Sequence, residues 1–235
     1  MSKKRTHRTT VLYAIGKRLL YPYYKLVYRI RVTGRENIPA EGPVLLCCNH
    51  MAKKDPVLLG VMTHRQVFYM AKEELFQNGF IGKILRALGA FPVARGTGGT
   101  DALQNAYDLL EDNAVVGVFI EGTRSKTGEL GRPKTGAALL AYQTQAPVVP
   151  ACITGEGGTF SRPFHRTLIN FGPAISPEAL HIPDETSLSL RRASRTMMAG
   201  IAQLRGEARA YFGVPDPAPE PAPAALPETA PKEGE

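Results

Sequence analysis

Short β-rich runs alternate with helical stretches from about residue 43 onwards, and this alternation constrains the fold more than any other feature of the sequence. It predicts an α/β fold in which helices flank a layered mixed sheet. The expected strands are Val44–Cys48, Val67–Met70, Phe91–Val93, Val115–Ile120, Val148–Ile153 and Leu168–Phe171. The expected helices are Pro56–Thr63, Leu75–Leu88, Asp101–Asp112, Thr135–Gln145 and Ser187–Phe212.

The composition changes at both ends of this pattern, which predicts four segments. Residues 1–10 are polar and basic and are expected to be disordered, and residues 11–32 are expected to form amphipathic interfacial helices. Residues 33–213 are expected to form the α/β domain. Residues 214–235 are rich in Pro, Ala and Glu, a composition that cannot build a core and predicts a disordered tail.

The N-terminal segment is strongly basic. Residues 1–31 carry nine Lys or Arg and no acidic residue, which indicates a polyanionic partner, either an anionic membrane or nucleic acid. Tyrosines and aliphatic residues at helical spacing lie among these charges, which is typical of a membrane-docking helix; the alternative is an amphipathic helix packed on its own domain. Pro22 is expected to divide the segment into two short helices. The sequence contains no apolar run of about 18 residues and no secretory signal pattern, so membrane contact is expected at the surface only.

Three of the expected strands run directly into polar clusters. Val44–Cys48 leads into Asn49 and His50, Phe91–Val93 leads into Arg95, and Val115–Ile120 leads into Glu121. In open α/β sheets the ligand crevice lies beyond the carboxyl ends of the strands. If these strands are parallel, all three clusters face one crevice.

His50 and Asp55 are the candidate catalytic pair. In a continuous helix they would lie about 140° apart, so they can meet only if the chain turns between them. Asp55 as a helix N-cap and Pro56 as the first helical residue would give that turn. An imidazole can take the proton of an attacking hydroxyl, and a carboxylate on its other nitrogen fixes the tautomer. The alternative is a structural histidine beside an ordinary Asp-Pro helix start.

No nucleophile of another kind stands out. The sequence has no G-x-S-x-G elbow, and Cys47 and Cys48 belong to a run that reads as a buried strand. The third cysteine, Cys152, leaves an odd count that does not make a disulfide framework, and a reducing compartment is the simplest interpretation. No Cys/His cluster with metal-ligand spacing is present, so no metal is expected.

The turn from Glu121 to Ser125 is the candidate anion site. Gly122 allows a tight turn or close approach of a ligand, and the guanidinium of Arg124 offers a fork of donors suited to phosphate. The alternative is a surface turn with an internal Glu–Arg ion pair. Arg95 is a second candidate phosphate ligand, and its alternative is a solvated loop charge. The glycines after Arg95 lack the spacing of a nucleotide-binding loop.

Taken together, these motifs resemble the glycerolipid acyltransferase family, in particular its 1-acylglycerol-3-phosphate O-acyltransferases. The asparagine-histidine block with its later aspartate is met by Asn49, His50 and Asp55. The other blocks are met by residues 89–95, residues 119–125 with Lys134 and Gly136, and residues 147–150. Ile120 and Pro92 depart from the family pattern, which puts the shape of the acceptor pocket in question.

The resemblance implies a mechanism and a location. His50 would deprotonate the sn-2 hydroxyl of lysophosphatidic acid, oriented by Asp55, while acyl-CoA or acyl-acyl carrier protein would supply the acyl group as co-substrate, with no cofactor. Arg95 and Arg124 would bind the acceptor phosphate. Glu121, Gly122 and Thr123 would shape that site. The enzyme would be peripheral, on the phospholipid surface at the cytoplasmic face of the cell membrane.

Two alternatives stay open. The acceptor could be glycerol-3-phosphate, another lysophospholipid or a glycolipid, because the histidine-aspartate pair is shared across such acceptors. A protein of another class, a non-catalytic membrane binder, would use the basic N-terminus alone and leave His50 dispensable. No recognised nucleic-acid module is present, so nucleic acid is not expected as a partner.

Overall fold

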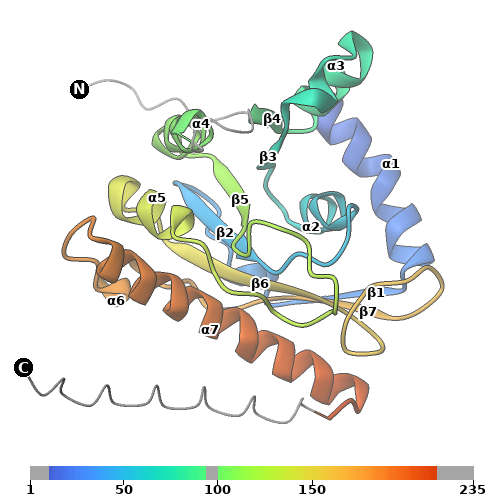
Figure 1. Ribbon diagram of the computed structural model, residues 1–235. Helices are drawn as coiled ribbons and strands as arrows, with labels where there is room; N and C mark the ends of the chain where they lie inside the picture. The colour runs from blue at the N-terminus through green and yellow to red at the C-terminus, as the bar shows by residue number, and fades with distance from the viewer. Residues whose placement is uncertain (1–10, 94–99, 216–235) are drawn as a thin grey trace, which may run out of the picture.

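The computed structural model describes residues 11–93 and 100–215 (Figure 1). The predictions for the basic residues 1–10, for Arg95 and for nearly all of the tail therefore fall outside the described residues.

The described residues form one seven-stranded sheet with helices on both faces (Figure 1). In spatial order its strands are β1 (Ile30–Thr33), β7 (Thr167–Phe171), β6 (Val148–Gly155), β2 (Val44–Cys48), β5 (Val115–Phe119), β3 (Val67–Lys72) and β4 (Ala90–Val93). The helices are α1 (Val11–Val27), η1 (Arg35–Asn37), α2 (Asp55–Met62), η2 (Glu73–Phe76), α3 (Gly79–Ala87), α4 (Thr100–Glu111), α5 (Gly136–Thr144), α6 (Pro177–Leu180) and α7 (Ser187–Phe212).

The sheet is mixed, as the sequence predicts. β6, β2, β5, β3 and β4 pair in parallel, whereas β7 runs antiparallel to β6 and carries β1 as a parallel neighbour. β2, β5 and β4 therefore end at the same edge of the sheet. The strands are thus parallel, which is the condition under which the sequence predicts that their polar clusters face one crevice.

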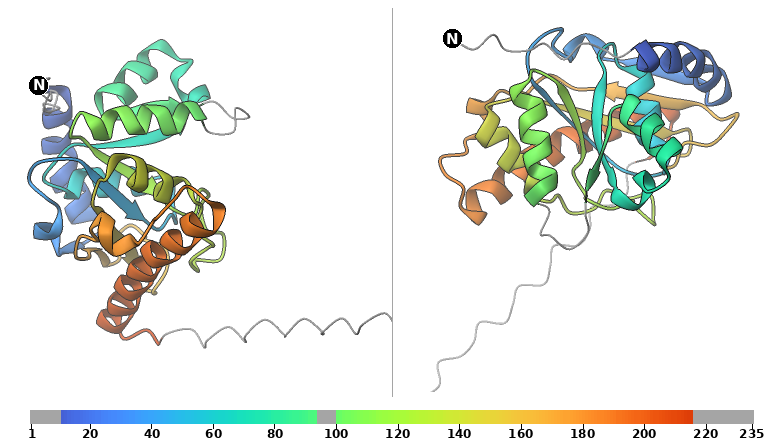
Figure 2. Two further views of the ribbon diagram at one scale, coloured as in Figure 1. Left: turned by 90° about the vertical axis from the view of Figure 1, so that its left-hand side faces the viewer. Right: turned by 90° about the horizontal axis from the view of Figure 1, so that it is seen from above.

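The hydrophobic core lies in two layers, one on each face of β2. Leu45 and Cys47 pack toward α4, α5 and α7, while Leu46 and Cys48 pack toward α1 and α2. The two groups of helices lie on opposite faces of the sheet (Figure 2). Successive residues of a strand point to opposite faces, so a strand buried on both sides needs an unbroken apolar run. That requirement explains the Val-Leu-Leu-Cys-Cys sequence of β2 and fixes the strand that carries His50 at its end.

Two predictions for the N-terminal segment are wrong. α1 is a single helix that continues through Pro22. Pro22 has no N–H to bond to the carbonyl of Arg18, but both residues are exposed, so water can bond to that carbonyl. Its N-terminal half is also held to α2, where Tyr13 Oη donates to Gly60 O at 2.9 Å and Lys17 Nζ donates to Thr63 O. Residues 30–32, expected to be helical, belong instead to β1, which lies beside β7.

The described helices include none that is long and apolar enough to cross a bilayer.

Candidate active site

The imidazole of His50 and the carboxylate of Asp55 meet at the carboxyl end of β2. His50 Nδ1 lies 3.1 Å from Asp55 Oδ2; the histidine side chain is 17% exposed and the aspartate is fully buried. With Nδ1 engaged as the donor to a carboxylate, Nε2 is the nitrogen left to accept a proton. The structure thus brings the two predicted catalytic residues together.

The turn between them is built by the same aspartate. Asp55 Oδ2 also accepts hydrogen bonds from Met51 N and Ala52 N, both at 2.6 Å. Asp55 is the first residue of α2 and Lys54 is its N-cap, so the prediction of Asp55 as the N-cap is wrong by one position. The carboxylate reaches back to the preceding turn instead of capping the helix, which leaves it free to orient His50.

Asn49 has a positioning role that its place in the sequence motif does not reveal. Its buried side chain bridges β2 and β6: Asn49 Nδ2 donates to Ile153 O at 3.0 Å, and Ile153 N donates to Asn49 Oδ1 at 2.8 Å. The amide continues the pairing of the two strands by one further step. It therefore fixes the point at which the chain leaves the sheet toward His50.

An aromatic stack fixes the plane of the His50 ring. Phe119, the last residue of β5, lies against it with ring centroids 4.0 Å apart and planes inclined by 21°. Tyr69 stacks on Phe119 in turn, with centroids 5.9 Å apart. Tyr69 takes this position because Gly117 has no side chain; a Cβ there would lie 2.1 Å from the tyrosine ring.

Glu121 is buried and supports His50 through the backbone. Its Oε1 accepts from His50 N at 3.0 Å and its Oε2 accepts from Gly131 N at 2.7 Å. The Glu121 carboxylate thus connects the loop after β5 to the backbone of His50. The alternative of a Glu121–Arg124 ion pair is wrong, because Arg124 makes no ion pair with another residue in the described ranges.

Gly122, Thr123 and Arg124 form the exposed top of this loop. Gly122 has φ of 72°, a conformation that favours glycine, and the aliphatic stem of Lys134 lies beside it. Ser125 N donates to His50 O at 2.8 Å, so the exposed residues are held next to the histidine. The structure thus places the three exposed turn residues beside the dyad.

The cysteines are not available as nucleophiles. Cys47, Cys48 and Cys152 are all fully buried. Burial raises the pKa of Cys47 and of Cys152 to about 12, and it raises that of Cys48 well above its ordinary value. Among the described residues, no group of His, Cys, Asp and Glu is arranged to hold a metal ion.

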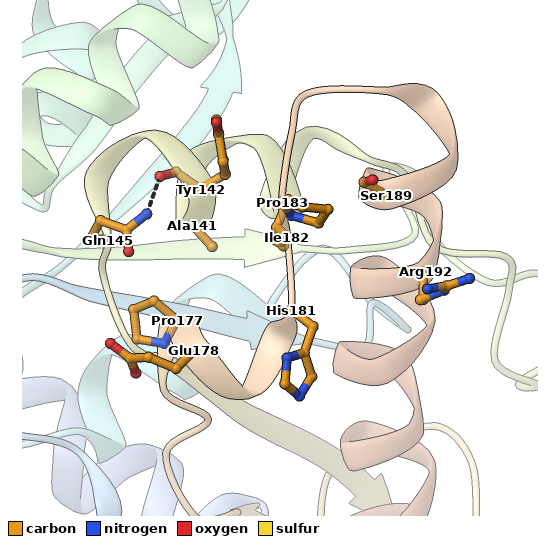
Figure 3. A pocket seen from close by; sticks show the side chains of 10 residues that line it. All are labelled: Ala141, Tyr142, Gln145, Pro177, Glu178, His181, Ile182, Pro183, Ser189 and Arg192. Atoms are coloured by element: carbon orange, nitrogen blue, oxygen red, sulfur yellow. Dashed lines mark hydrogen bonds between the residues drawn. The ribbon is translucent and has the colours of Figure 1, made fainter.

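An apolar cavity of about 220 Å³ is lined from α1, α2, β3 and α3, and neither His50 nor Asp55 is part of its wall. Pro56, which follows Asp55, belongs to its wall, as does Tyr69 of the aromatic stack. A second depression of about 500 Å³ lies between α5, α6 and α7 and includes His181 and Arg192 (Figure 3). Its residue Gln145 lies just before the start of β6, at the opposite sheet edge from His50, so this depression is separate from the site.

The fold and the site define an α/β protein with a paired histidine and aspartate at the carboxyl end of a central strand. Comparison with known proteins gives the family: the Acyltransferase family model matches residues 29–154, and the chain belongs to this family. It is therefore an acyltransferase.

Two relatives and one solved structure show how far the similarity extends. The chain is 35% identical over 163 residues to the 1-acyl-sn-glycerol-3-phosphate acyltransferase of Bacillus subtilis, covering 68% of this chain and 81% of that protein. It is 33% identical over 141 residues to a chloroplastic enzyme of the same name from Arabidopsis thaliana, covering 59% of this chain and 38% of the relative. The 1-acyl-sn-glycerophosphate acyltransferase of Thermotoga maritima shares the fold, with a TM-score of 0.59 at 23% identity over 82% of this chain and 78% of that one.

Proposed function

We propose that this enzyme transfers a fatty acyl group from a thioester donor to the sn-2 hydroxyl of 1-acylglycerol-3-phosphate, which gives phosphatidic acid and a free thiol. The observation that carries the proposal is the contact of 3.1 Å between His50 and Asp55, beside the exposed turn that carries Arg124. The names of the relatives from Bacillus subtilis and Arabidopsis thaliana support this acceptor.

The proposed reaction is a direct transfer. His50 Nε2 takes the proton of the acceptor hydroxyl while the hydroxyl oxygen attacks the thioester carbonyl carbon. Asp55 stabilises the imidazolium that forms. The tetrahedral intermediate then collapses, the carbon–sulfur bond breaks, and the thiolate leaves with the proton returned by His50. Acyl-CoA and acyl-acyl carrier protein both carry such a thioester.

The exposed turn is the proposed site for the acceptor phosphate. Arg124 has no ion-pair partner among the described residues, and a guanidinium can bind phosphate through two parallel hydrogen bonds. Gly122 and Thr123 shape this site, and Glu121 holds it against His50. Arg95, which follows β4 in the sequence, is proposed as the second phosphate ligand.

The apolar cavity is the proposed site for an acyl chain. Most of its wall is aliphatic, for example Val57, Val61, Leu85 and Leu88, and burial of methylene groups against such a wall contributes about 0.8 kcal/mol each. Tyr69 lines the cavity and stacks toward His50 through Phe119, which supports a position of the bound chain near the dyad.

We also propose that α1 docks the enzyme peripherally on the cytoplasmic face of the cell membrane. Leu12, Ile15, Leu19 and Leu26 form an exposed stripe on α1, at 51%, 51%, 68% and 79% exposure. Exposed apolar residues in a basic helix favour insertion into an anionic lipid surface. A Leu19→Ser variant is expected to lose binding to vesicles of phosphatidylglycerol and phosphatidylcholine, whereas Leu188→Ser, equally exposed on α7, is the matched control.

The test of the reaction compares the wild type with His50→Ala, using labelled acyl-CoA and labelled acyl-acyl carrier protein in separate arms. Lysophosphatidic acid in mixed micelles is the acceptor, and His181→Ala at the opposite sheet edge is the control. Phosphatidic acid formed by the wild type and the control but not by His50→Ala is expected. Product from glycerol-3-phosphate or another lysolipid alone would give the alternative acceptor, and activity retained in His50→Ala would refute the dyad.

A further inference from the structure

Arg205 of α7 is a buried arginine whose guanidinium contacts the loop after β5. Its Nη2 donates to Gly128 O at 2.7 Å, and its Nη1 lies 2.9 Å from Glu129 Oε2. The arginine side chain is 6% exposed and that of Glu129 is 49% exposed. A guanidinium is costly to bury unless it is well paired, and here both partners belong to one loop. The contact therefore fixes that loop on α7.

The anchored residues are bonded in turn to the part of the loop that contacts His50. Gly128 N donates to Ser125 Oγ at 3.0 Å, and Ser125 Oγ donates to Glu129 O at 2.7 Å. Ser125 N donates to His50 O at 2.8 Å. Hydrogen bonds through Gly128, Glu129 and Ser125 thus connect the guanidinium of Arg205 to the backbone of His50.

The far end of the loop returns to the same histidine. Gly131 N donates to one oxygen of the Glu121 carboxylate, whose other oxygen accepts from His50 N. Both backbone polar groups of His50 are therefore held by residues 121–131. Arg205 contacts this segment between the two attachment points, where a shift would move the exposed turn relative to the imidazole.

We propose that Arg205 is a positioning residue for acyl transfer, which holds residues 121–131 so that Arg124 and His50 keep one fixed separation. The inference rests on the proposed function of Arg124 as a phosphate ligand. A loosened loop would place the acceptor phosphate wrongly with respect to the dyad, and small misplacements of a reacting group are costly in rate. Arg205 touches neither substrate nor reacting atoms.

The neighbouring Arg209 is also a buried arginine of α7, but its main contacts are not with the loop of residues 121–131. Arg209 Nε and Nη2 donate to Pro215 O at 3.1 and 2.6 Å, and its closest approach to Glu129 is 3.7 Å. It therefore fixes mainly the chain after α7. Arg205 has the shorter contacts with the loop and alone bonds to Gly128 O among the described residues.

The kinetic test uses the full chain with Arg205→Met and Arg205→Lys. Ile201→Ala is the control, because Ile201 is fully buried one turn earlier in α7 and lies in the core instead of on the loop. At a temperature where all variants are folded, Arg205→Met is expected to raise the KM for the acceptor about tenfold and to lower kcat, with an unchanged KM for the donor. Arg205→Lys, which can bond to one loop group but not both, is expected to lie between. Equal changes in both KM values, or the same changes in Ile201→Ala, would overturn the proposal.

Amide hydrogen exchange gives a readout that needs no activity. Exchange in residues 122–131 is expected to speed up about tenfold in Arg205→Met and to stay unchanged in Ile201→Ala. Unchanged exchange together with an unchanged acceptor KM refutes the role of Arg205 and leaves the proposed function standing. Faster exchange in an enzyme that acylates no lysophospholipid refutes the proposed acceptor and keeps Arg205 as the residue that holds the loop.

Discussion

Substitution of Asp55 by asparagine removes the charge of the dyad and keeps its shape. Three donors, His50 Nδ1, Met51 N and Ala52 N, point at Asp55 Oδ2, whereas the buried Oδ1 has no hydrogen-bond partner. The two backbone N–H groups will therefore hold the amide oxygen of asparagine in the Oδ2 position. His50 Nδ1–H keeps an acceptor, so the substitution retains the productive tautomer.

The size of the effect follows from the charge that is lost. Two unit charges about 4 Å apart interact by about 4 kcal/mol at an effective dielectric constant of about 20. His50 is partly exposed and the amide dipole replaces part of the interaction, so about 2–4 kcal/mol of transition-state stabilisation should disappear. At about 1.36 kcal/mol for each factor of ten, kcat should fall by about 30- to 1000-fold. That is less than the loss of about 10⁴ that accompanies a wrong tautomer.

The assay measures thiol release from acyl-CoA with lysophosphatidic acid in mixed micelles, for the wild type, Asp55→Asn and Asp55→Ala. The three cysteines of the enzyme are buried and will not react with the thiol reagent while the protein is folded. Asp55→Ala should also lower the Tm, because it leaves the N–H groups of Met51 and Ala52 without their acceptor, at about 1–3 kcal/mol for each buried group. Activity of Asp55→Asn within threefold of the wild type would refute the role of the charge, and a loss beyond 10⁴ would refute the tautomer argument.

Three further predictions test the remaining parts of the site. Arg124→Ala should raise the KM for lysophosphatidic acid about 10- to 100-fold, because bonds to a charged group contribute about 1.5–3 kcal/mol, and it should leave the KM for acyl-CoA unchanged; equal changes in both values would contradict it. Phe80→Ser on α3, where the phenylalanine is 74% exposed, should weaken binding to anionic vesicles about tenfold, measured by co-sedimentation; unchanged binding would limit docking to α1. Stability in urea should fall above pH 9, because burial raises the pKa of Cys47 and Cys152 from 9.0 to about 12, so the stabilisation is complete below pH 9 and is lost as pH rises toward 12. Each thiol contributes a slope of about 1.4 kcal/mol per pH unit, and Lys17, whose pKa burial lowers to about 8, offsets part of the fall; a flat profile from pH 9 to 11 would contradict this prediction.

The sequence predicts the elements whose burial is uniform and misses those that depend on distant pairing. The bounds of β2 and α7 agree with the predicted Val44–Cys48 and Ser187–Phe212, because a fully buried strand and a long amphipathic helix leave clear patterns. The sequence predicts a helix for the first three residues of β1, because they continue a basic and apolar segment. Only its pairing with β7, more than 130 positions later, makes it a strand.

In the candidate site, too, the local contacts could be predicted and the contacts between distant residues could not. The proximity of His50 and Asp55 could be predicted, because a strand end, a turn and an Asp-Pro helix start lie within the nine residues from Cys48 to Pro56. The supports of His50 could not, because their partners are remote: Asn49 bonds to Ile153, 104 positions away, and Glu121 to the His50 backbone, 71 positions away. No local pattern marks such contacts.

The surroundings of the cysteines and of Ser125 favour direct acyl transfer over a mechanism with a covalent acyl-enzyme. Cys47 and Cys48 lie closest to His50 in sequence, but their side chains point into the two cores of the sheet and burial raises the pKa of both thiols. Ser125 Oγ is engaged between Gly128 N and Glu129 O. None of these three side chains is available as a nucleophile, which supports the proposed attack by the acceptor hydroxyl and predicts sequential kinetics without a burst of thiol when acceptor is omitted. A stoichiometric burst with acyl-CoA alone, or ping-pong kinetics, would require one of these side chains to leave its place and would refute direct transfer.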